Sequence, residues 1–204
     1  MFPKLTPATR AIILVNVVVF LLELVAARPI LWNFALWPLA PDSPFHWWQL
    51  VTYAFLHDPK GITHILFNMF ALYVFGPALE QYWGPRRYLV YYFVCIIAAG
   101  ATQLAADYFS GSVGEAIGAS GAIFGILLAF AILFPRVRLL LYFAIPVPAW
   151  LFVTGYAVLE LFFGVTGMEA GVAHFAHLGG MLGGALLLLF WRLVDGSGPG
   201  RRSV

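Results

Sequence analysis

Two side chains that could together form a nucleophile lie far apart in this chain. Ser120 stands in the segment GASG, and His177 stands in the segment HFAH. An imidazole within hydrogen-bond reach of a serine hydroxyl can accept its proton, and this pair is the minimal activated oxygen nucleophile. The chemistry requires that folding bring the two residues to one place.

A second pair, His64 and Asn68 in the segment HILFN, could stabilise a developing oxyanion. The two are four residues apart, so they share one face of a helix. The side-chain amide of Asn68, the ring N–H of His64 and the backbone N–H of Ser120 at a helix start are all available donors. Gly118 lets the backbone bend just before the serine without a Cβ clash. These groups predict an acyl-transfer site.

The composition places these polar residues in a very apolar chain. Of the 204 residues, 62% are hydrophobic and 10% are charged. A soluble domain of this size could not bury that much apolar surface. This excludes a soluble enzyme and a disordered segment, and a net charge of +2 gives no sign of a nucleic-acid partner. We therefore expect an all-α polytopic membrane protein.

Six apolar runs predict the membrane-spanning helices, since a span takes about 20 residues. They cover approximately residues 11–27, 64–83, 88–106, 120–134, 140–163 and 172–194. Pro146 and Pro148 predict that the first half of the fifth helix is kinked or unwound. We expect one domain over residues 1–204, with a flexible tail at 195–204.

The distribution of basic residues predicts the orientation. One side of the predicted topology holds nine: Lys4, Arg10, Arg86, Arg87, Arg136, Arg138, Arg192, Arg201 and Arg202. The other side holds only Arg28 and Lys60. The positive-inside rule therefore places both termini in the cytoplasm. The long Trp-rich loop 28–63 then faces outward, and we expect it to lie at the membrane interface, as a functional element or as an anchor.

This topology also predicts that the polar residues share one depth. His64, Ser120 and His177 all fall near the outer ends of helices that run inward. Polar side chains in hydrocarbon cost a few kcal/mol, so they are expected to have a function or a partner. Individually, each also fits a bond within its own helix or between helices. Their common level favours one site.

Glycine pairs predict how Ser120 and His177 meet. Gly121 and Gly125 follow the serine, and Gly180 and Gly184 follow the histidine. Small residues four apart let membrane helices approach closely. If these faces pack together, the hydroxyl and the imidazole lie at the contact.

Taken together, these motifs resemble the rhomboid family of intramembrane serine proteases. The resemblance extends over about residues 10–193, and it includes His64-x-x-x-Asn68, Gly118-Ala119-Ser120-Gly121, Ala176-His177 with Gly180 and Gly184, the block WWQLVTYAFLH, and Glu80. It implies a six-helix bundle with a long first outer loop. It also implies that Ser120 is the nucleophile, that His177 is the base, and that His64 and Asn68 are oxyanion partners.

The chain departs from that family pattern at three points. Gln49 follows Trp48 where many relatives carry an arginine, so a cation is missing from the first loop. Phe124 stands where some relatives carry a tyrosine, which keeps stacking on His177 but not a phenolic hydrogen bond. No additional domain is expected before the first helix.

Other titratable residues remain as alternatives. His174 could compete with His177 as the base, but His177 occupies the motif position. Asp107, Glu160 and Glu169 are candidates for a third acid, although each also fits a helix end or an interhelical bond. The resemblance implies a Ser–His dyad. His46 and His57 are expected at the interface with no role.

The implied function is cleavage of transmembrane segments of other membrane proteins near the outer face of a plasma membrane. The compact chain favours a bacterial plasma membrane. The expected partners are transmembrane substrates and lipids, and the oligomeric state is left open. No metal or cofactor is expected, because no clustered ligand motif is present. A non-catalytic protein that binds transmembrane clients and a transporter are the alternative functions.

Overall fold

The computed structural model describes residues 4–141, 144–168 and 172–194, and helices make up most of it. The long helices are α1 (Pro7–Phe34), α3 (Ile62–Trp83), α4 (Pro85–Ser110), α5 (Ser120–Leu133), α6 (Ala149–Thr166) and α7 (His174–Val194). Between α1 and α3 lie the short helix α2 (Gln49–Thr52) and the 3₁₀ turn η1 (Tyr53–Phe55). Strands β1 (Arg138–Leu141) and β2 (Ile145–Pro148) form a hairpin between α5 and α6.

Among the described residues, five helices are long and apolar enough to cross a membrane: α1, α3, α4, α6 and α7. This confirms a helical polytopic membrane protein. The remaining apolar helix, α5, has only 14 residues, and ten of them are buried. Because its neighbours surround it, α5 presents little surface to lipid.

The first helix extends beyond the predicted residues 11–27 at both ends. It begins at Pro7, whose fixed φ suits the first turn of a helix. It continues past a kink at Ala26 (φ −135°, ψ 45°) and past Pro29 as far as Phe34. The loop predicted at 28–63 is correspondingly shorter. The predicted tail at 195–204 lies outside the described residues.

The predicted fifth helix, residues 140–163, is not helical in its first half, where Pro146 and Pro148 predicted a kinked or unwound segment. Residues 138–141 and 145–148 instead form the paired strands β1 and β2, and α6 begins only at Ala149. Pro146 and Pro148 cause the difference, since proline lacks an N–H and holds the preceding residue in extended backbone. The hairpin is apolar enough to be mistaken for a helix by hydropathy alone.

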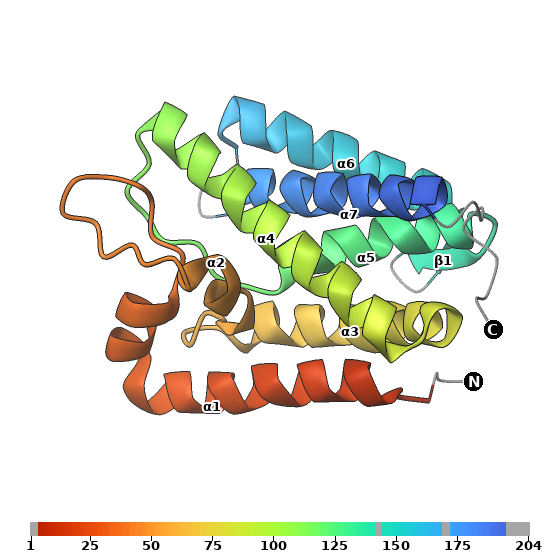
Figure 1. Ribbon diagram of the computed structural model, residues 1–204, viewed down its shortest axis with the longest axis horizontal. Coiled ribbons are helices and arrows are strands. Elements are labelled where there is room, and N and C mark those ends of the chain that lie inside the picture. Colours follow the sequence, from red (N-terminus) through yellow and green to blue (C-terminus); the bar gives the residue numbers. More distant parts are fainter. Residues whose placement is uncertain (1–3, 142–143, 169–171, 195–204) are drawn as a thin grey trace.

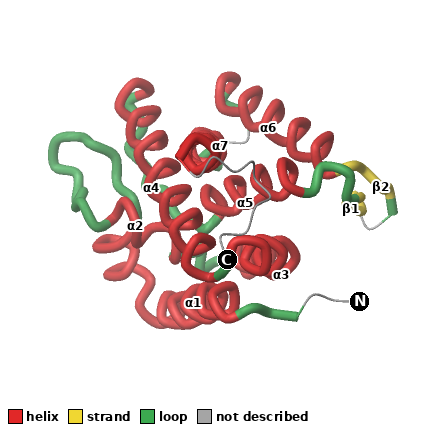
Figure 2. The backbone as a smooth tube through the Cα atoms, turned by 45° about the vertical axis from the view of Figure 1, so that its right-hand side comes forward, coloured by secondary structure: helices red, strands yellow, loops and turns green. Residues whose placement is uncertain are grey.

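The arrangement of the helices brings three of their N-terminal ends together. In Figure 1, α5 lies in the middle of the bundle, with α3 below it, α7 and α6 above it and α4 crossing in front. The long loop after α1 lies at the left, which we call the loop end, and α3, α5 and α7 all start from this end. Figure 2 shows the β1–β2 hairpin at the opposite end and α6 at the periphery. His64, Ser120 and His177 therefore all lie in the first turns of helices that start at the loop end.

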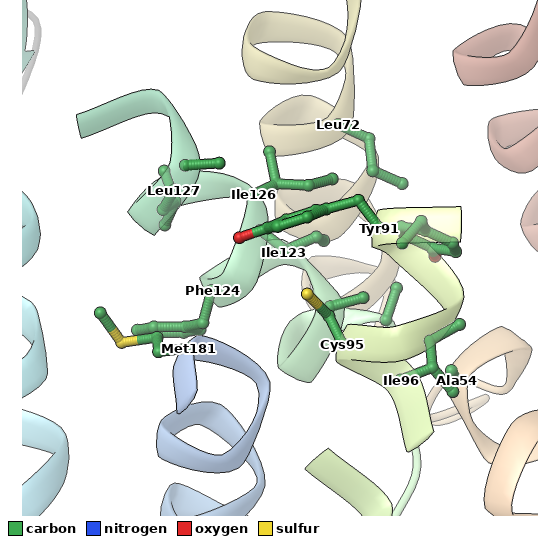
Figure 3. Close-up of a cluster of buried hydrophobic side chains, with 14 of the residues drawn as sticks. Ala54, Leu72, Tyr91, Cys95, Ile96, Ile123, Phe124, Ile126, Leu127 and Met181 are labelled. Atoms are coloured by element: carbon green, nitrogen blue, oxygen red, sulfur yellow. The ribbon is translucent and has the colours of Figure 1, made fainter. Parts of the chain in front are cut away.

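The core is built where α4, α5 and α7 meet. Figure 3 shows Tyr91 and Cys95 of α4 directed toward α5, with Phe124 of α5 beside Met181 of α7. Tyr91 and Cys95 are completely buried. This apolar cluster lies directly beyond the polar residues of the loop end and holds their helices in fixed positions.

Candidate active site

Ser120 and His177 lie in contact. The Nε2 atom of His177 is 2.7 Å from the Oγ atom of Ser120, which is hydrogen-bond distance. Ser120 is the first residue of α5, and His177 lies in the first turn of α7. His177 is 7% exposed, so the pair is largely shielded from solvent.

The close approach of α5 and α7 depends on Gly180. A Cβ atom at this position would overlap the backbone carbonyl of Gly121. A Cβ atom on Gly125 would lie 3.0 Å from the carbonyl oxygen of Gly180 and would overlap the Sγ atom of Cys95. The two backbones therefore touch one turn beyond the Ser120–His177 pair.

The other α7 glycines face α4, a helix that the glycine pairs in the sequence did not predict as a neighbour of α7. A Cβ atom on Gly184 would overlap the hydroxyl of Tyr91, which donates a hydrogen bond of 2.8 Å to the carbonyl of Gly125. A Cβ atom on Gly183 would overlap the side chain of Ala98. Helix α7 is thus seated in a groove between α4 and α5, and both helices set its position.

The ring of Phe124 stacks on the imidazole of His177. Their centroids are 4.3 Å apart, and the ring planes differ by 10°. This contact limits rotation of the imidazole and leaves its Nε2 edge directed at Ser120. Phe124 has no hydroxyl, so it contributes shape and not a hydrogen bond.

The segment before Ser120 is anchored to the first loop. Leu36 and Ala116 exchange two backbone hydrogen bonds of 3.0 and 2.9 Å, and the N–H of Gly118 donates to the carbonyl of Tyr53 at 3.0 Å. Gly118 has φ +120°, a conformation that L side chains rarely adopt. Its missing side chain also makes room for His64, because a Cβ atom would lie 2.8 Å from the His64 Nε2.

His64 and Asn68 lie on α3, with His64 facing this segment. The backbone N–H of Asp58 donates to His64 Nδ1 at 3.3 Å, which places the proton of the neutral ring on Nε2, toward Gly118. Asn68 donates one amide hydrogen to the carbonyl of His64 at 2.8 Å. Its second amide hydrogen and the Nε2–H of His64 remain as candidate donors for an oxyanion.

The histidines of the first loop lie in two different environments. His57 is completely buried, with its ring in edge contact with His64 at a centroid separation of 5.0 Å, so its ring faces the protein interior. Burial lowers the pKa of His57 to about 3. His46 instead stacks on Trp48 in a more exposed part of the loop.

Gln49 ties the first loop together where an arginine was expected from the family pattern. Its buried amide donates to the carbonyl of Pro44 at 2.9 Å and to that of Asn33 at 3.3 Å. Its oxygen accepts the backbone N–H of Trp37 at 3.4 Å. A neutral side chain therefore links three parts of this loop by hydrogen bonds.

One carboxylate approaches the candidate base more closely than the sequence indicated. The Oε2 atom of Glu160 on α6 lies 2.8 Å from Nδ1 of His177 and 2.7 Å from Nδ1 of His174. All three side chains are buried. The sequence signal was a glutamate within an apolar run, where an ionisable residue has a partner or a function.

The other acidic candidates do not join this group. Asp107 accepts a hydrogen bond of 2.8 Å from Gln103 of its own helix, and it lines a separate cavity of about 290 Å³ between α4, α6 and α7. His174 lies at the edge of the same cavity. Glu169 lies outside the described residues.

Known proteins are similar to this chain over much of its length. The rhomboid domain model matches residues 44–193. Rhomboid protease AarA of Providencia stuartii is 27% identical over 210 residues, covering 91% of this chain and 73% of that protein. Rhomboid protease GluP of Bacillus subtilis is 43% identical over 81 residues, covering 40% of this chain and 15% of that protein.

A mitochondrial relative, rhomboid protein 1 of Saccharomyces cerevisiae, is 33% identical over 147 residues, which cover 68% of this chain and 40% of the yeast protein. The chain thus spans less than half of the Bacillus and yeast relatives. The domain match covers well over half of the chain and includes all four polar residues of the site. The chain belongs to the rhomboid family.

Proposed function

We propose that this chain is an intramembrane serine endopeptidase in which Ser120 is the nucleophile and His177 is the general base. The observation that carries the proposal is the 2.7 Å contact between His177 Nε2 and Ser120 Oγ in a largely buried site. The names of AarA and GluP as rhomboid proteases agree with it.

The reaction divides into acylation and deacylation. His177 takes the hydroxyl proton as Ser120 Oγ attacks the scissile carbonyl carbon, and the carbonyl oxygen becomes an oxyanion. The N–H of Ser120, the amide of Asn68 and the Nε2–H of His64 stabilise that charge. His177 then gives its proton to the leaving amine as the C–N bond breaks. Water, deprotonated by His177, hydrolyses the acyl-enzyme and restores the serine.

The substrate is a transmembrane segment of another membrane protein. A peptide bond inside a helix has its carbonyl engaged in an internal hydrogen bond, so the segment must unwind locally before Ser120 can attack. Small or helix-breaking residues at the cleavage site favour this unwinding. We expect such residues to raise the cleavage rate.

The proposed topology has six spans, with the short helix α5 as the fourth and the termini in the cytoplasm. The nine-to-two distribution of basic residues supports it. The loop end then faces outward, with the Trp-rich first loop at the membrane interface, and water reaches Ser120 from that side. A bacterial plasma membrane suits this orientation.

The test is incubation of the purified protein in detergent with a model transmembrane substrate and, separately, with a serine-reactive fluorophosphonate. The proposal expects cleavage, labelling at Ser120, and the loss of both in Ser120→Ala. Cleavage by Ser120→Ala, or labelling at another residue, would overturn the nucleophile assignment. A folded protein with neither activity would favour a client-binding protein without catalysis.

A further inference from the structure

We propose that Glu160 positions the base His177, with His174 holding Glu160 in place, so that the site works as a serine–histidine–glutamate triad. This inference rests on the proposed function, because it assigns Glu160 a role only if His177 is the base. Ser120 Oγ, His177 Nε2, His177 Nδ1 and Glu160 Oε2 form a continuous chain with separations of 2.7 and 2.8 Å across the ring.

The tautomer of His177 gives Glu160 its role. To accept the proton of Ser120, Nε2 must be unprotonated, so the ring hydrogen must lie on Nδ1. Nδ1 of His177 is buried, with no aligned hydrogen bond among the described residues, and the Oε2 atom of Glu160 lies 2.8 Å from it as a candidate acceptor. Hydrogen bonds of resting catalytic groups are often poorly aligned and tighten when substrate binds.

The carboxylate also suits the charge that forms during the reaction. His177 becomes a cation when it takes the serine proton, and a buried cation is costly without an opposite charge. Glu160, which is 7% exposed, supplies that charge next to the ring. A charge-assisted hydrogen bond of this kind is about twice as strong as a neutral one.

His174 explains why Glu160 points toward His177. Its Nδ1–H donates an aligned hydrogen bond of 2.7 Å to the same Oε2 atom that faces His177. Helix α6 otherwise buries few residues: within its described length only Ala149, Val153 and Glu160 are buried. The His174–Glu160 bond therefore fixes the carboxylate on a helix that has little other packing to hold it.

The separations favour a proton over a metal ion between these groups. Glu160, His174 and His177 have the residue types of a metal site, and their ligand atoms lie within 4.8 Å of one another. Ligands on a tetrahedral zinc ion lie about 3.3 Å apart, since each bond is about 2.0–2.1 Å long. The observed 2.7 and 2.8 Å are hydrogen-bond distances.

The main test is Glu160→Gln, which keeps the shape of the side chain but removes its charge and one acceptor. We expect kcat to fall on the order of 10²–10⁴-fold with KM little changed, as expected when the base loses its orienting acid. The rate of fluorophosphonate labelling at Ser120 should fall with it. Glu160→Asp, which keeps a carboxylate, should recover part of both rates. Unchanged kcat and labelling in a folded Glu160→Gln protein would overturn the proposal.

A double-mutant comparison separates positioning from simple packing. His174→Ala should lower kcat about tenfold in the wild-type background and should cost nothing further in Glu160→Gln, because His174 acts through Glu160. Additive losses would contradict this. If Glu160→Gln does not fold, wild-type kcat in both His174→Ala and Glu160→Asp would overturn the proposal instead.

Two controls keep this test distinct from the proposed function itself. Glu80→Gln removes another buried glutamate and should leave kcat and labelling unchanged, which excludes a general effect of losing a buried carboxylate. Ser120→Ala tests the nucleophile. If Ser120→Ala is inactive while Glu160→Gln is fully active, only the role of Glu160 fails; if Ser120→Ala cleaves normally, the proposed function fails.

Discussion

Two of the three glutamates that are buried among the described residues, Glu80 and Glu160, lie toward opposite ends of the bundle and have different kinds of partner. Glu80 of α3 accepts hydrogen bonds from the start of α1: the N–H groups of Ala8 and Thr9 at 2.9 and 2.8 Å, and the hydroxyls of Thr9 and Thr6. Glu160 of α6 faces two imidazoles, those of His174 and His177. Exposure does not separate them, since Glu80 is 3% exposed and Glu160 is 7% exposed.

The difference teaches that the partners of a buried carboxylate indicate its role better than its burial does. The donors around Glu80 are amides and hydroxyls, which do not change charge during a reaction, and they cap the first turn of α1. The donors around Glu160 are imidazoles, and one of them touches a serine hydroxyl. Changes around Glu160 should therefore affect turnover, and changes around Glu80 should affect the free energy of unfolding.

The largest expected effect separates the two imidazoles of Glu160. His177→Ala should abolish cleavage and fluorophosphonate labelling while the protein remains folded, because Ser120 then has no base. His174→Ala should lower kcat only about tenfold, because His174 acts on His177 through Glu160. Both are measured by initial cleavage rates together with thermal unfolding in detergent. Equal losses from the two substitutions would mean that the base has been assigned to the wrong histidine.

A large loss of turnover is also expected from the oxyanion side of the site. Asn68→Ala should lower kcat about 10²–10³-fold if the amide is a full oxyanion donor, with KM little changed. Thr166→Ala, which removes an exposed side chain that donates to its own helix, is the control and should keep the wild-type kcat. Cleavage by Asn68→Ala at the wild-type rate would leave its bond to the His64 carbonyl as its only role.

A substitution at the α5–α7 contact tests whether a shift of Ser120 relative to His177 is enough to lower kcat. Gly180→Val should lower turnover on the order of 10²-fold, because a shift of about 1 Å at the reacting groups has that effect. Activity should fall more steeply than the unfolding temperature, since Ser120 and His177 separate before the bundle fails.

Gly155→Ala is a control for the addition of a side chain at a helix glycine, the change that Gly180→Val makes at the α5–α7 contact. A Cβ atom at Gly155 meets nothing within 4 Å among the described residues, whereas a Cβ atom at Gly180 overlaps the Gly121 carbonyl. Gly155→Ala should keep full activity. Full activity in Gly180→Val would show that the contact is not needed to bring Ser120 to His177.

The sequence could predict the Ser120–His177 contact because two local patterns agreed. Charge bias placed both residues at one depth, and glycines followed each of them along the same helix face. The second neighbour of α7 was missed, because Ala98 and Thr102 of α4 are ordinary helix residues whose packing against glycine has no pattern of its own.

Glu160 could be nominated but not assigned from the sequence. Its place relative to His177 depends on where α6 begins, and the apolar hairpin residues 138–148 extended the predicted helix nine residues too far. Pro146 and Pro148 were the correct signal that the first half is not a regular helix. Pairing of β1 with β2 and the rotation of α6 are tertiary features that hydropathy does not contain.

A substitution at Glu80 should lower the free energy of unfolding and not the turnover. Glu80→Gln replaces a carboxylate that accepts four hydrogen bonds with an amide that has only one oxygen acceptor. Donors left unsatisfied in a buried site cost about 1–3 kcal/mol, so the free energy of unfolding should fall by that amount. Turnover per folded molecule should not change. A loss of kcat larger than the loss of folded protein would break the contrast with Glu160.

The smallest expected effect comes from His57, which lies near His64 at the loop end but whose two ring nitrogens have no hydrogen-bond partner among the described residues. Burial lowers the pKa of His57 to about 3, below the value of about 6.5 in an unfolded chain. The unfolded state therefore gains a proton first as pH falls, and this destabilises the protein below about pH 6.5. Between pH 7.5 and pH 5.5 the free energy of unfolding falls by about 1.4 kcal/mol.

His57→Phe should remove that part of the acid sensitivity, measured as the difference in unfolding free energy between the two pH values. Turnover at pH 7.5 should be unchanged, because nearness to the site does not by itself give a buried polar residue a catalytic role. An unaltered pH dependence in His57→Phe would show that burial does not keep His57 neutral. A large loss of kcat would show that the hydrogen-bond partners of a buried residue do not indicate whether its role is structural or catalytic.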